Sequence, residues 1–281
     1  GPMAIAEAPD GTVLVSGGPN RGDIFRLGHD GGAVDAPWAS LDEPVFNLAF
    51  DGEGRLWATT GGGALLQLDP ESGEVVNRFG DGVTIALAVE PGTDRLFVST
   101  NAGVEIFDPA TGVFTLWSRD RNLRVGGLAF APDGTLWATT WPDRRQVVRF
   151  TDRARAEVML EFDADVDSLA FGQASTPLDG LLFVSHNAGL VSDVGLAQAA
   201  SALTMVDVAT RRRVAVARGG SRGDVVVTTG DGRVLLSQSH QVDVLQPVRA
   251  PSVAATNPPA DAVVPLPLPF VTVTFDQDMF A

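Results

Sequence analysis

A short pattern that recurs six times along the chain constrains its fold more than any other feature. Each copy combines an apolar residue, a large apolar or aromatic residue, a smaller one and a hydroxyl, and follows a turn rich in Asp and Gly. The copies occupy residues 11–16, 55–59, 95–99, 135–139, 181–185 and 233–237. Their anchor residues are spaced by 43, 40, 40, 46 and 52 positions, at Val13, Leu56, Leu96, Leu136, Leu182 and Val234. Periods of this length are typical of stacked repeat architectures.

Each repeat divides into four short strands. In the second repeat, alternation and Gly, Asp and Pro residues mark strands at 46–50, 56–60, 65–68 and 74–78. Helical repeats would need a 3.6-residue period, which these segments lack. A lone unit of this kind exposes two apolar faces, so neighbouring units must stack. We therefore predict an all-β fold, a six-bladed β-propeller of four-stranded antiparallel blades over residues 3–248.

The last two repeats depart from the pattern. The fifth has an insertion at 188–201, which we expect to form one short helix over the rim. The sixth offers strands at 224–229, 234–237 and 241–245 but no obvious fourth. Because the chain starts directly on an inner strand at 4–6, we expect residues just after Gln246 to supply the missing outer strand.

The two ends of the chain read differently from the repeats. Residues 1–2 look like the scar of a cleaved tag. Residues 249–281 are rich in Pro, and the segment Val273–Met279 resembles the opening of a bacterial Ig-like domain. A sandwich of that kind needs about one hundred residues. We expect a linker and the N-terminal fragment of an Ig-like domain here, a short β and Pro-rich extension within a longer, multidomain protein.

Composition narrows the classes of partner. The net charge of −15 disfavours phosphate backbones and anionic lipid. Without Cys the chain has no disulfides, thiolate chemistry or Cys-ligated zinc, and it lacks the run of about twenty apolar residues that a membrane helix needs. We expect a monomer with a protein or glycan ligand and neighbouring domains of the same chain as partners, without nucleic acid binding or membrane insertion.

The repeats resemble propellers of the NHL, YncE-like, gluconolactonase-like and streptogramin-lyase-like families. Asp133–Thr139 with Val147–Phe150 looks like a streptogramin-lyase-type blade, and Leu96–Asn101 with Ile106–Gly112 looks like a YncE-type blade. Fold analogy does not carry function. Streptogramin lyases use His and Glu residues that include a His-Gly-Ile element, and none of His29, His186 and His240 lies in such a context. This favours a protein that is not an enzyme.

The gluconolactonase-like resemblance implies a different site. Those enzymes hold a divalent cation with a Glu, two Asn or Asp residues and another Asp around the channel, and this chain offers Glu7, Asn47, Asp167 and Asp224 on or beside inner strands. Such oxygen ligands would suit calcium. However, Glu7 aligns with Phe residues of other blades while Asn47 aligns with Ser168, so the four do not share one level. We expect no cofactor, with calcium or another divalent cation as the alternative.

Loops at one face supply the candidates for ligand binding. Loops between second and third strands and those entering the inner strands surround the channel mouth, and their polar and aromatic residues form a plausible rim. The candidates are Asn101, Trp141, Arg144, His186, Asn187, Asp224 and His240. Trp141 has a structural alternative as a cap on the adjacent blade, and His186 as a partner of neighbouring backbone.

Three repeated features receive structural interpretations. The hydroxyls that end the copies are interpreted as blade-to-blade hydrogen bonds, because none has a paired base. Trp57 and Trp137 are predicted to lie in the core. The two Arg-Gly-Asp tripeptides, at 21–23 and 222–224, are attributed to coincidence rather than adhesion.

Our leading hypothesis is a non-enzymatic binding or spacer propeller of a large exported or cell-surface bacterial protein, which recognises a protein or glycan at the channel mouth. The alternative is a metal-assisted lactonase or lyase with its site in the channel. An intracellular scaffold is the third hypothesis.

Overall fold

The structure is a computed structural model, and it describes residues 3–19, 21–28, 34–118, 123–141, 144–190, 199–220, 225–247, 253–259, 262–264 and 270–275. The chain divides into two compact units, residues 1–246 and 247–281. Our sequence analysis placed this boundary after residue 248. The described residues contain no helix that is long and apolar enough to cross a membrane.

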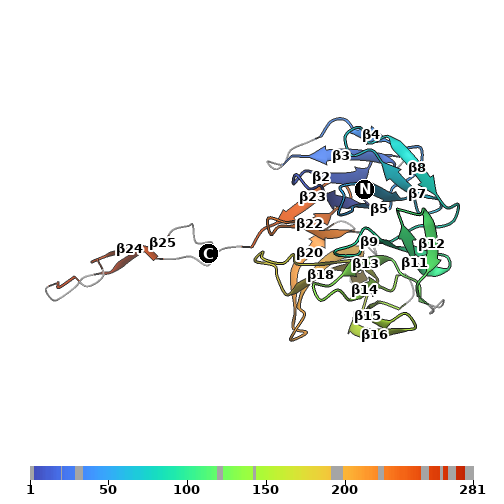
Figure 1. Ribbon diagram of the computed structural model, residues 1–281. Helices are drawn as coiled ribbons and strands as arrows, with labels where there is room; N and C mark the ends of the chain where they lie inside the picture. Colours follow the sequence, from blue (N-terminus) through green and yellow to red (C-terminus); the bar gives the residue numbers. More distant parts are fainter. Residues whose placement is uncertain are drawn as a thin grey trace. The chain divides into compact units, whose positions relative to one another are not determined.

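The first unit is a ring of six antiparallel sheets (Figure 1). The first sheet holds β1 (Ile5–Glu7), β2 (Val13–Gly17), β3 (Asp23–Leu27) and β4 (Ala39–Ser40). The second holds β5 (Asn47–Phe50), β6 (Leu56–Thr59), β7 (Leu65–Leu68) and β8 (Val75–Phe79). The third holds β9 (Leu87–Val89), β10 (Leu96–Thr100), β11 (Gly103–Asp108) and β12 (Val113–Leu116).

The other three sheets continue the series. The fourth holds β13 (Gly127–Phe130), β14 (Leu136–Thr139), β15 (Gln146–Asp152) and β16 (Arg155–Glu161). The fifth holds β17 (Val166–Phe171), β18 (Leu181–Leu190), β19 (Ala199–Asp207) and β20 (Arg213–Gly220). The sixth holds β21 (Val226–Thr228), β22 (Val234–Ser237) and β23 (Val242–Leu245).

The inner strands close the ring. Each of β1, β5, β9, β13, β17 and β21 contacts the next, and β21 contacts β1. The described residues are strands, turns and irregular segments, without a helix. The predicted six-bladed propeller is therefore confirmed, with four strands in five blades and three described strands in the sixth.

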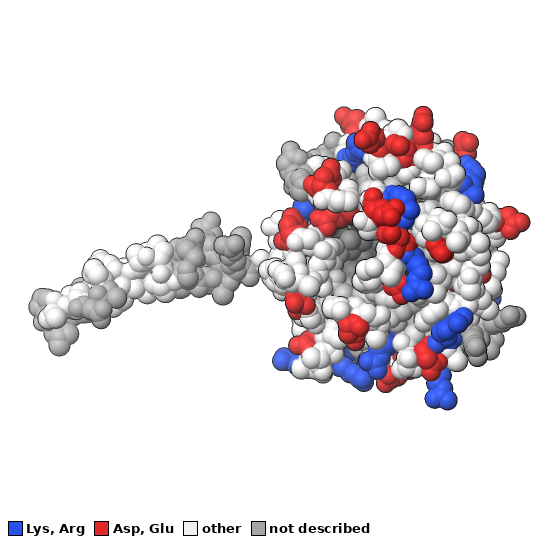
Figure 2. All heavy atoms as spheres, in the orientation of Figure 1, with Lys and Arg blue, Asp and Glu red and all other residues white. Residues whose placement is uncertain are grey.

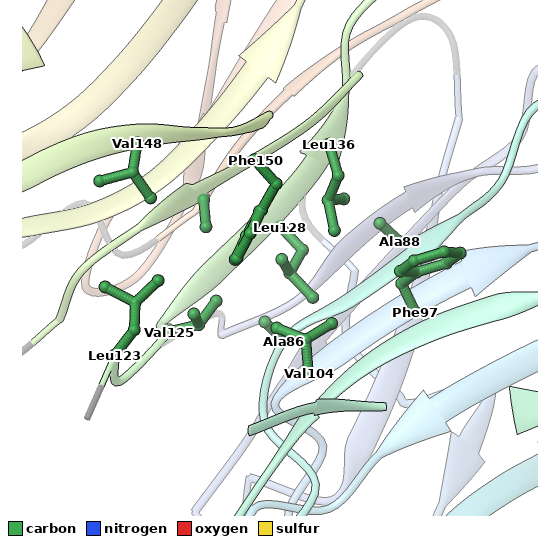
Figure 3. Close-up of a cluster of buried hydrophobic side chains, with 11 residues drawn as sticks. Ala86, Ala88, Phe97, Val104, Leu123, Val125, Leu128, Leu136, Val148 and Phe150 are labelled. Atoms are coloured by element: carbon green, nitrogen blue, oxygen red, sulfur yellow. The ribbon is translucent and has the colours of Figure 1, made fainter. Parts of the chain in front are cut away.

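Apolar side chains fill the space between neighbouring blades. The anchors Leu56, Leu96 and Leu182 are completely buried. Figure 3 shows one such cluster, in which Leu128 and Phe150 of the fourth blade pack with Phe97 and Val104 of the third. Trp57 and Trp137 are buried in other clusters, as predicted. Burial on both faces of each sheet is what makes the stack of blades stable.

Hydroxyl groups link successive blades at the end of the second strands. Four of them donate to a backbone carbonyl beside the next inner strand, with O···O distances of 3.1, 2.6, 2.9 and 3.2 Å for Ser16 to Val45, Thr59 to Ile85, Ser99 to Val125 and Thr139 to Asp167. The blade-to-blade interpretation is confirmed for these four. The hydroxyl of Ser237 accepts a hydrogen bond from Val225 N within its own blade. The Oγ of Ser185 has no hydrogen-bond partner within the described part of the chain.

The predicted helix over 188–201 is wrong at both of its ends. Residues 188–190 belong to β18 and residues 199–201 to β19, and Leu190 is paired with Ala199. Longer pairing gives the backbone groups at both ends of the insertion partners in the neighbouring strand, whereas a short helix leaves its first N–H and last C=O groups without partners. Residues 191–198 lie outside the described residues.

The sixth sheet holds three described strands, and the described strands of the second unit form a sheet of their own. In the second unit, β24 (Val253–Asn257) pairs with β25 (Thr272–Phe275). Residues 248–252 lie outside the described residues, so the expectation that the segment just after Gln246 supplies the outer strand stays a prediction. Val253, Val271 and Val273 are exposed on that hairpin. The Ig-like assignment stays a prediction, and residues 1–2 lie outside the described residues.

Candidate functional site

A cavity of about 440 Å³ occupies the centre of the ring. Inner strands form its wall. The register of each inner strand against the second strand of its blade shows at which level along the channel axis a lining residue lies. The middle level is formed by the six inner-strand residues that pair with the residue two positions after the anchor of their blade. All six are apolar, namely Ile5, Leu48, Leu87, Leu128, Leu169 and Val226. The cavity is therefore a channel whose polar side chains lie towards its two ends.

Two aromatic side chains at the mouth rest on glycines. A Cβ at residue 126 would stand 2.6 Å from Trp141 Cβ, and one at residue 61 would stand 2.4 Å from the Phe46 ring. Such separations are shorter than real carbon contacts, so both rings need a residue without a side chain beneath them. Trp141 nevertheless keeps 38% of its surface exposed and lines the cavity.

Asp167 lies beside Trp141 at the same mouth. Its backbone oxygen accepts a hydrogen bond from Thr139 Oγ1 and would stand 3.3 Å from a Cβ at Gly127. The pairing of β17 with β18 shifts register between Val166 and Ser168, so Asp167 sits at a bulge. Bulges re-aim side chains beside functional sites, and this one adds an acidic residue to the lining of the mouth.

The far end combines one carboxylate with three phenyl rings. Glu7, Phe50, Phe130 and Phe171 are each paired with the anchor of their blade, so they share one level, and all line the cavity. Phe130 and Phe171 also pack edge-on against Phe97 and Trp137 of the preceding blades. Glu7 takes the place of such a Phe in the first blade, where its Oε2 accepts from Gly230 N at 2.7 Å.

The candidate metal ligands do not converge. Asn47 lies three residues from the level of Glu7, which corresponds to roughly 10 Å along a strand. Glu7 Oε2 accepts from Gly230 N, and Asn47 Oδ1 from Leu48 N at 2.9 Å. No group of three His, Asp or Glu residues among those described is arranged to hold a metal ion. Asp224 is outside the described residues, and Glu7, Asn47 and Asp167 do not fit one divalent cation.

The predicted rim is only partly assembled. Of its members, Trp141 lines the cavity, whereas Asn101, Arg144 and His240 are exposed away from the lining. His186 lies in β18, where its Nε2 is 2.8 Å from Thr204 Oγ1 and its ring packs on Phe162 at 4.7 Å. Both contacts are with side chains, so the structural alternative of a bond from His186 to neighbouring backbone stays a prediction. The side chain of Asn187, and Asp224 as a whole, lie outside what the structure describes.

The first Arg-Gly-Asp tripeptide is built into the first blade. A Cβ at Gly22 would stand 2.3 Å from the Leu41 carbonyl oxygen, so the backbone there is tightly packed. Asp23 begins β3, and its carboxylate accepts from Ser40 Oγ at 2.7 Å. These contacts hold the tripeptide in the sheet rather than on a projecting loop. The second tripeptide and His29 lie outside the described residues.

Sequence reasoning missed the residues that shape the mouth. Phe46 received no role as a lining residue, and Gly126 none as the support of Trp141. A signal was present, because Gly126 and Gly127 stand where the second blade has Phe46 and Asn47. The partner of Glu7 was not foreseeable, since 223 residues separate it from Gly230.

Comparisons with known proteins identify the fold and no more than the fold. The chain is similar to a structure described as a streptogramin B lyase, with a TM-score of 0.58 at 13% identity over 86% of this chain and 92% of that one. It is also similar to selenomethionine-substituted virginiamycin B lyase from Staphylococcus aureus, with a TM-score of 0.57 at 11% identity over 89% of this chain and 87% of that one. No family model and no curated protein matches the sequence.

Proposed function

We propose that this propeller is a non-enzymatic binding module that recognises a protein ligand at its channel mouth. The observation that carries the proposal is Trp141, an aromatic side chain that is 38% exposed and rests on Gly126 at the entrance of the channel. Large aromatic residues held rigidly beside a pocket are the usual anchors of protein interfaces. The cavity volume lies within the range of ligand pockets.

The chemistry of the wall favours a protein over a glycan. Glycan rings need many hydrogen-bond partners, whereas Met3, Phe46 and Ile85 bring apolar side chains to a lining whose polar members include Asn47 and Asp167. Among the polar groups there, Asn47 already accepts from Leu48 N. An apolar segment or long side chain of a protein matches such a lining better.

The setting of the module is part of the same proposal. The chain separates into two units, and the hairpin of the second unit has exposed apolar residues. Both observations are consistent with neighbouring domains in a longer exported or cell-surface protein. The alternative of a metal-assisted lactonase or lyase is weakened by the separation of Glu7 from Asn47. Likeness to lyases at 13% identity concerns the fold and supplies no catalytic residue.

Protein and glycan arrays test the proposal. We expect binding of protein ligands by the wild type, a loss of about tenfold or more in Trp141→Ala, and retention in Trp141→Phe. Phe270→Ala is the matched control, because this aromatic residue is 69% exposed in the second unit. Binding of glycans alone, binding that ignores Trp141, or no binding at all would overturn the proposal.

A further inference from the structure

The inner strands turn one open backbone edge towards the channel, because each of them pairs only with the second strand of its own blade. In the fourth blade, Ala131 N donates to Thr135 O at 2.9 Å, just beyond the end of β13. Residues of an antiparallel strand bond alternately to one side and to the other. Leu128 and Phe130 therefore direct their N–H and C=O groups away from β14. Both residues line the channel, so these backbone groups face it.

Side chains satisfy some of the equivalent backbone groups in other blades. Asn47 Oδ1 accepts from Leu48 N at 2.9 Å, Ser168 Oγ accepts from Val226 N at 3.4 Å, and Gln173 Nε2 donates to Thr228 O at 2.9 Å. The register places Gly127 in the fourth blade where the second has Asn47 and the fifth has Ser168. Gly127 has no side chain to offer. Within the part of the chain that the structure describes, no group bonds to the channel-facing N–H or C=O of Leu128 or Phe130.

The open edge of β13 combines backbone polar groups with apolar side chains. Leu128 is only 7% exposed, and a buried backbone group needs a partner from water or from a ligand. An extended peptide supplies both donors and acceptors at alternate residues, which is how a strand adds to the edge of a sheet. It also carries side chains that match an apolar wall. A hydrocarbon has no such donors, and a sugar has no such side chains.

We propose that the channel binds an extended segment of the protein ligand, which adds as a strand to the open edge of β13 beneath Trp141. This deepens the proposed function and rests on it, because Trp141 is the anchor at the entrance to that edge. Gly126 and Gly127 place no side chain between the ring and the edge. The edge from Gly126 to Phe130 is roughly 13 Å long, so it accommodates about four extended residues of the ligand.

A pair of matched probes tests the backbone requirement without any variant. The first is acetyl-Val-Thr-Val-Thr-amide, since Val and Thr favour extended backbone. Charged side chains of both signs are spread over the face of the propeller in Figure 2, and an uncharged probe avoids attraction to them. The second is its ester analogue, in which oxygen replaces each internal N–H. By ligand-observed NMR, we expect millimolar or tighter binding of the peptide and at least about tenfold weaker binding of the ester. Equal affinities, or no peptide binding, would overturn the inference.

Amide hydrogen exchange locates the bound probe. We expect the peptide to slow exchange at Leu128 and Phe130, whose N–H groups it would bond, and to leave the outer strands β8 and β12 unchanged. Those outer strands are the natural control, because each is also the last strand of its described sheet and has an open edge. Protection of β8 or β12 without protection of Leu128 and Phe130 would overturn the assignment to the channel.

Two variants separate β13 from the other inner strands and this inference from the proposed function. Trp141→Ala should weaken the peptide about threefold or more. Asn47→Ala exposes Leu48 N on β5 and leaves β13 as it is, so the affinity should stay within about twofold. Tighter binding to Asn47→Ala would overturn the assignment to β13. Array ligands that need Trp141 but do not slow exchange at Leu128 and Phe130 would overturn this inference and leave the proposed function standing.

Discussion

Single residues in the turns show how local chemistry stabilises each blade. The pKa of Asp133 lies below the ordinary aspartate value of 3.8, chiefly because Thr135 Oγ1 donates to its carboxylate at 2.6 Å. Thr135 Oγ1 in turn accepts from the Trp137 indole at 3.0 Å, so the turn is tied to the core. In the second blade, buried Asp51 contacts Trp57 Nε1 directly at 2.8 Å. A buried indole thus finds its acceptor in the preceding turn.

At this scale we predict that Thr135→Val raises the pKa of Asp133 towards its ordinary value. A lowered folded-state pKa contributes stability that is present above the unfolded value and lost as pH falls through the folded one. The stability advantage of the wild type over the variant should therefore be larger at pH 7 than below the pKa of Asp133. Carboxyl NMR titration and denaturant unfolding measure both effects. Asp69, whose donors are Glu71 and Ser72, is the internal control, and an unchanged pKa of Asp133 would contradict the prediction.

Strands and loops set the shape of the mouth. The inner strand β13 begins at Gly127, and Gly126 before it leaves room for Trp141, which lies two residues after β14. The register of β13 against β14 places Gly127 opposite Thr139, two residues before Trp141. The position of Trp141 therefore depends on the pairing of β13 with β14 and on the absence of a side chain at Gly126.

We predict that Gly126→Ala lowers the free energy of unfolding by about 1–3 kcal/mol, the usual cost of overpacking. The new methyl would meet Trp141 Cβ, so the same substitution in a Trp141→Gly background should cost much less. Gly62→Ala is the matched control, because a Cβ there meets nothing within 4 Å. Denaturant unfolding of this double-mutant cycle gives the coupling. Equal costs in the two backgrounds would show that Gly126 does not support Trp141.

The ring as a whole has one seam that differs from its other interfaces. Between the sixth and first blades, the buried cluster among the described residues consists of Ile5, Val13, Val15 and Leu235. Other interfaces bury larger clusters, such as the one in Figure 3. The seam adds the hydrogen bond from Gly230 N to Glu7, and no described strand is shared between the two blades. Closure therefore depends on side-chain contacts.

Hydrogen exchange should reveal this seam. We predict that amides of β1 and β21 exchange faster than those of β13 and β14, because regions with little buried apolar area open first. Glu7→Ala should raise exchange at Gly230 and at the seam further, and leave β13 unchanged, since it removes a contact of the seam alone. Uniform protection of the amides around the ring would contradict this account. So would a rise in amide exchange throughout the Glu7→Ala variant.

The sequence alone predicted much of the architecture. The repeat spacing, the turn chemistry and the alternation predicted six blades, and the buried places of Trp57 and Trp137 followed from alignment of the copies. The prediction was wrong at 188–190 and 199–201, because β18 and β19 continue their pairing to Leu190 and Ala199 through residues whose sequence shows no strand alternation. Whether the candidate rim binds a ligand stays a prediction. Asn101, Arg144 and His240 are not among the lining residues of the cavity, because positions along a loop do not reveal which side chains reach the channel.

The sequence by itself determined the blades, because alternation, turns and the repeated anchors act within forty or so residues of chain. Tertiary structure decided the candidate site. The seat of Trp141 on Gly126, the bulge at Asp167 and the bond between Glu7 and Gly230 each require two segments to meet in space. Local propensity specifies the four-stranded blade that repeats. Closure of the ring determines which of the residues that depart from the repeat face one another.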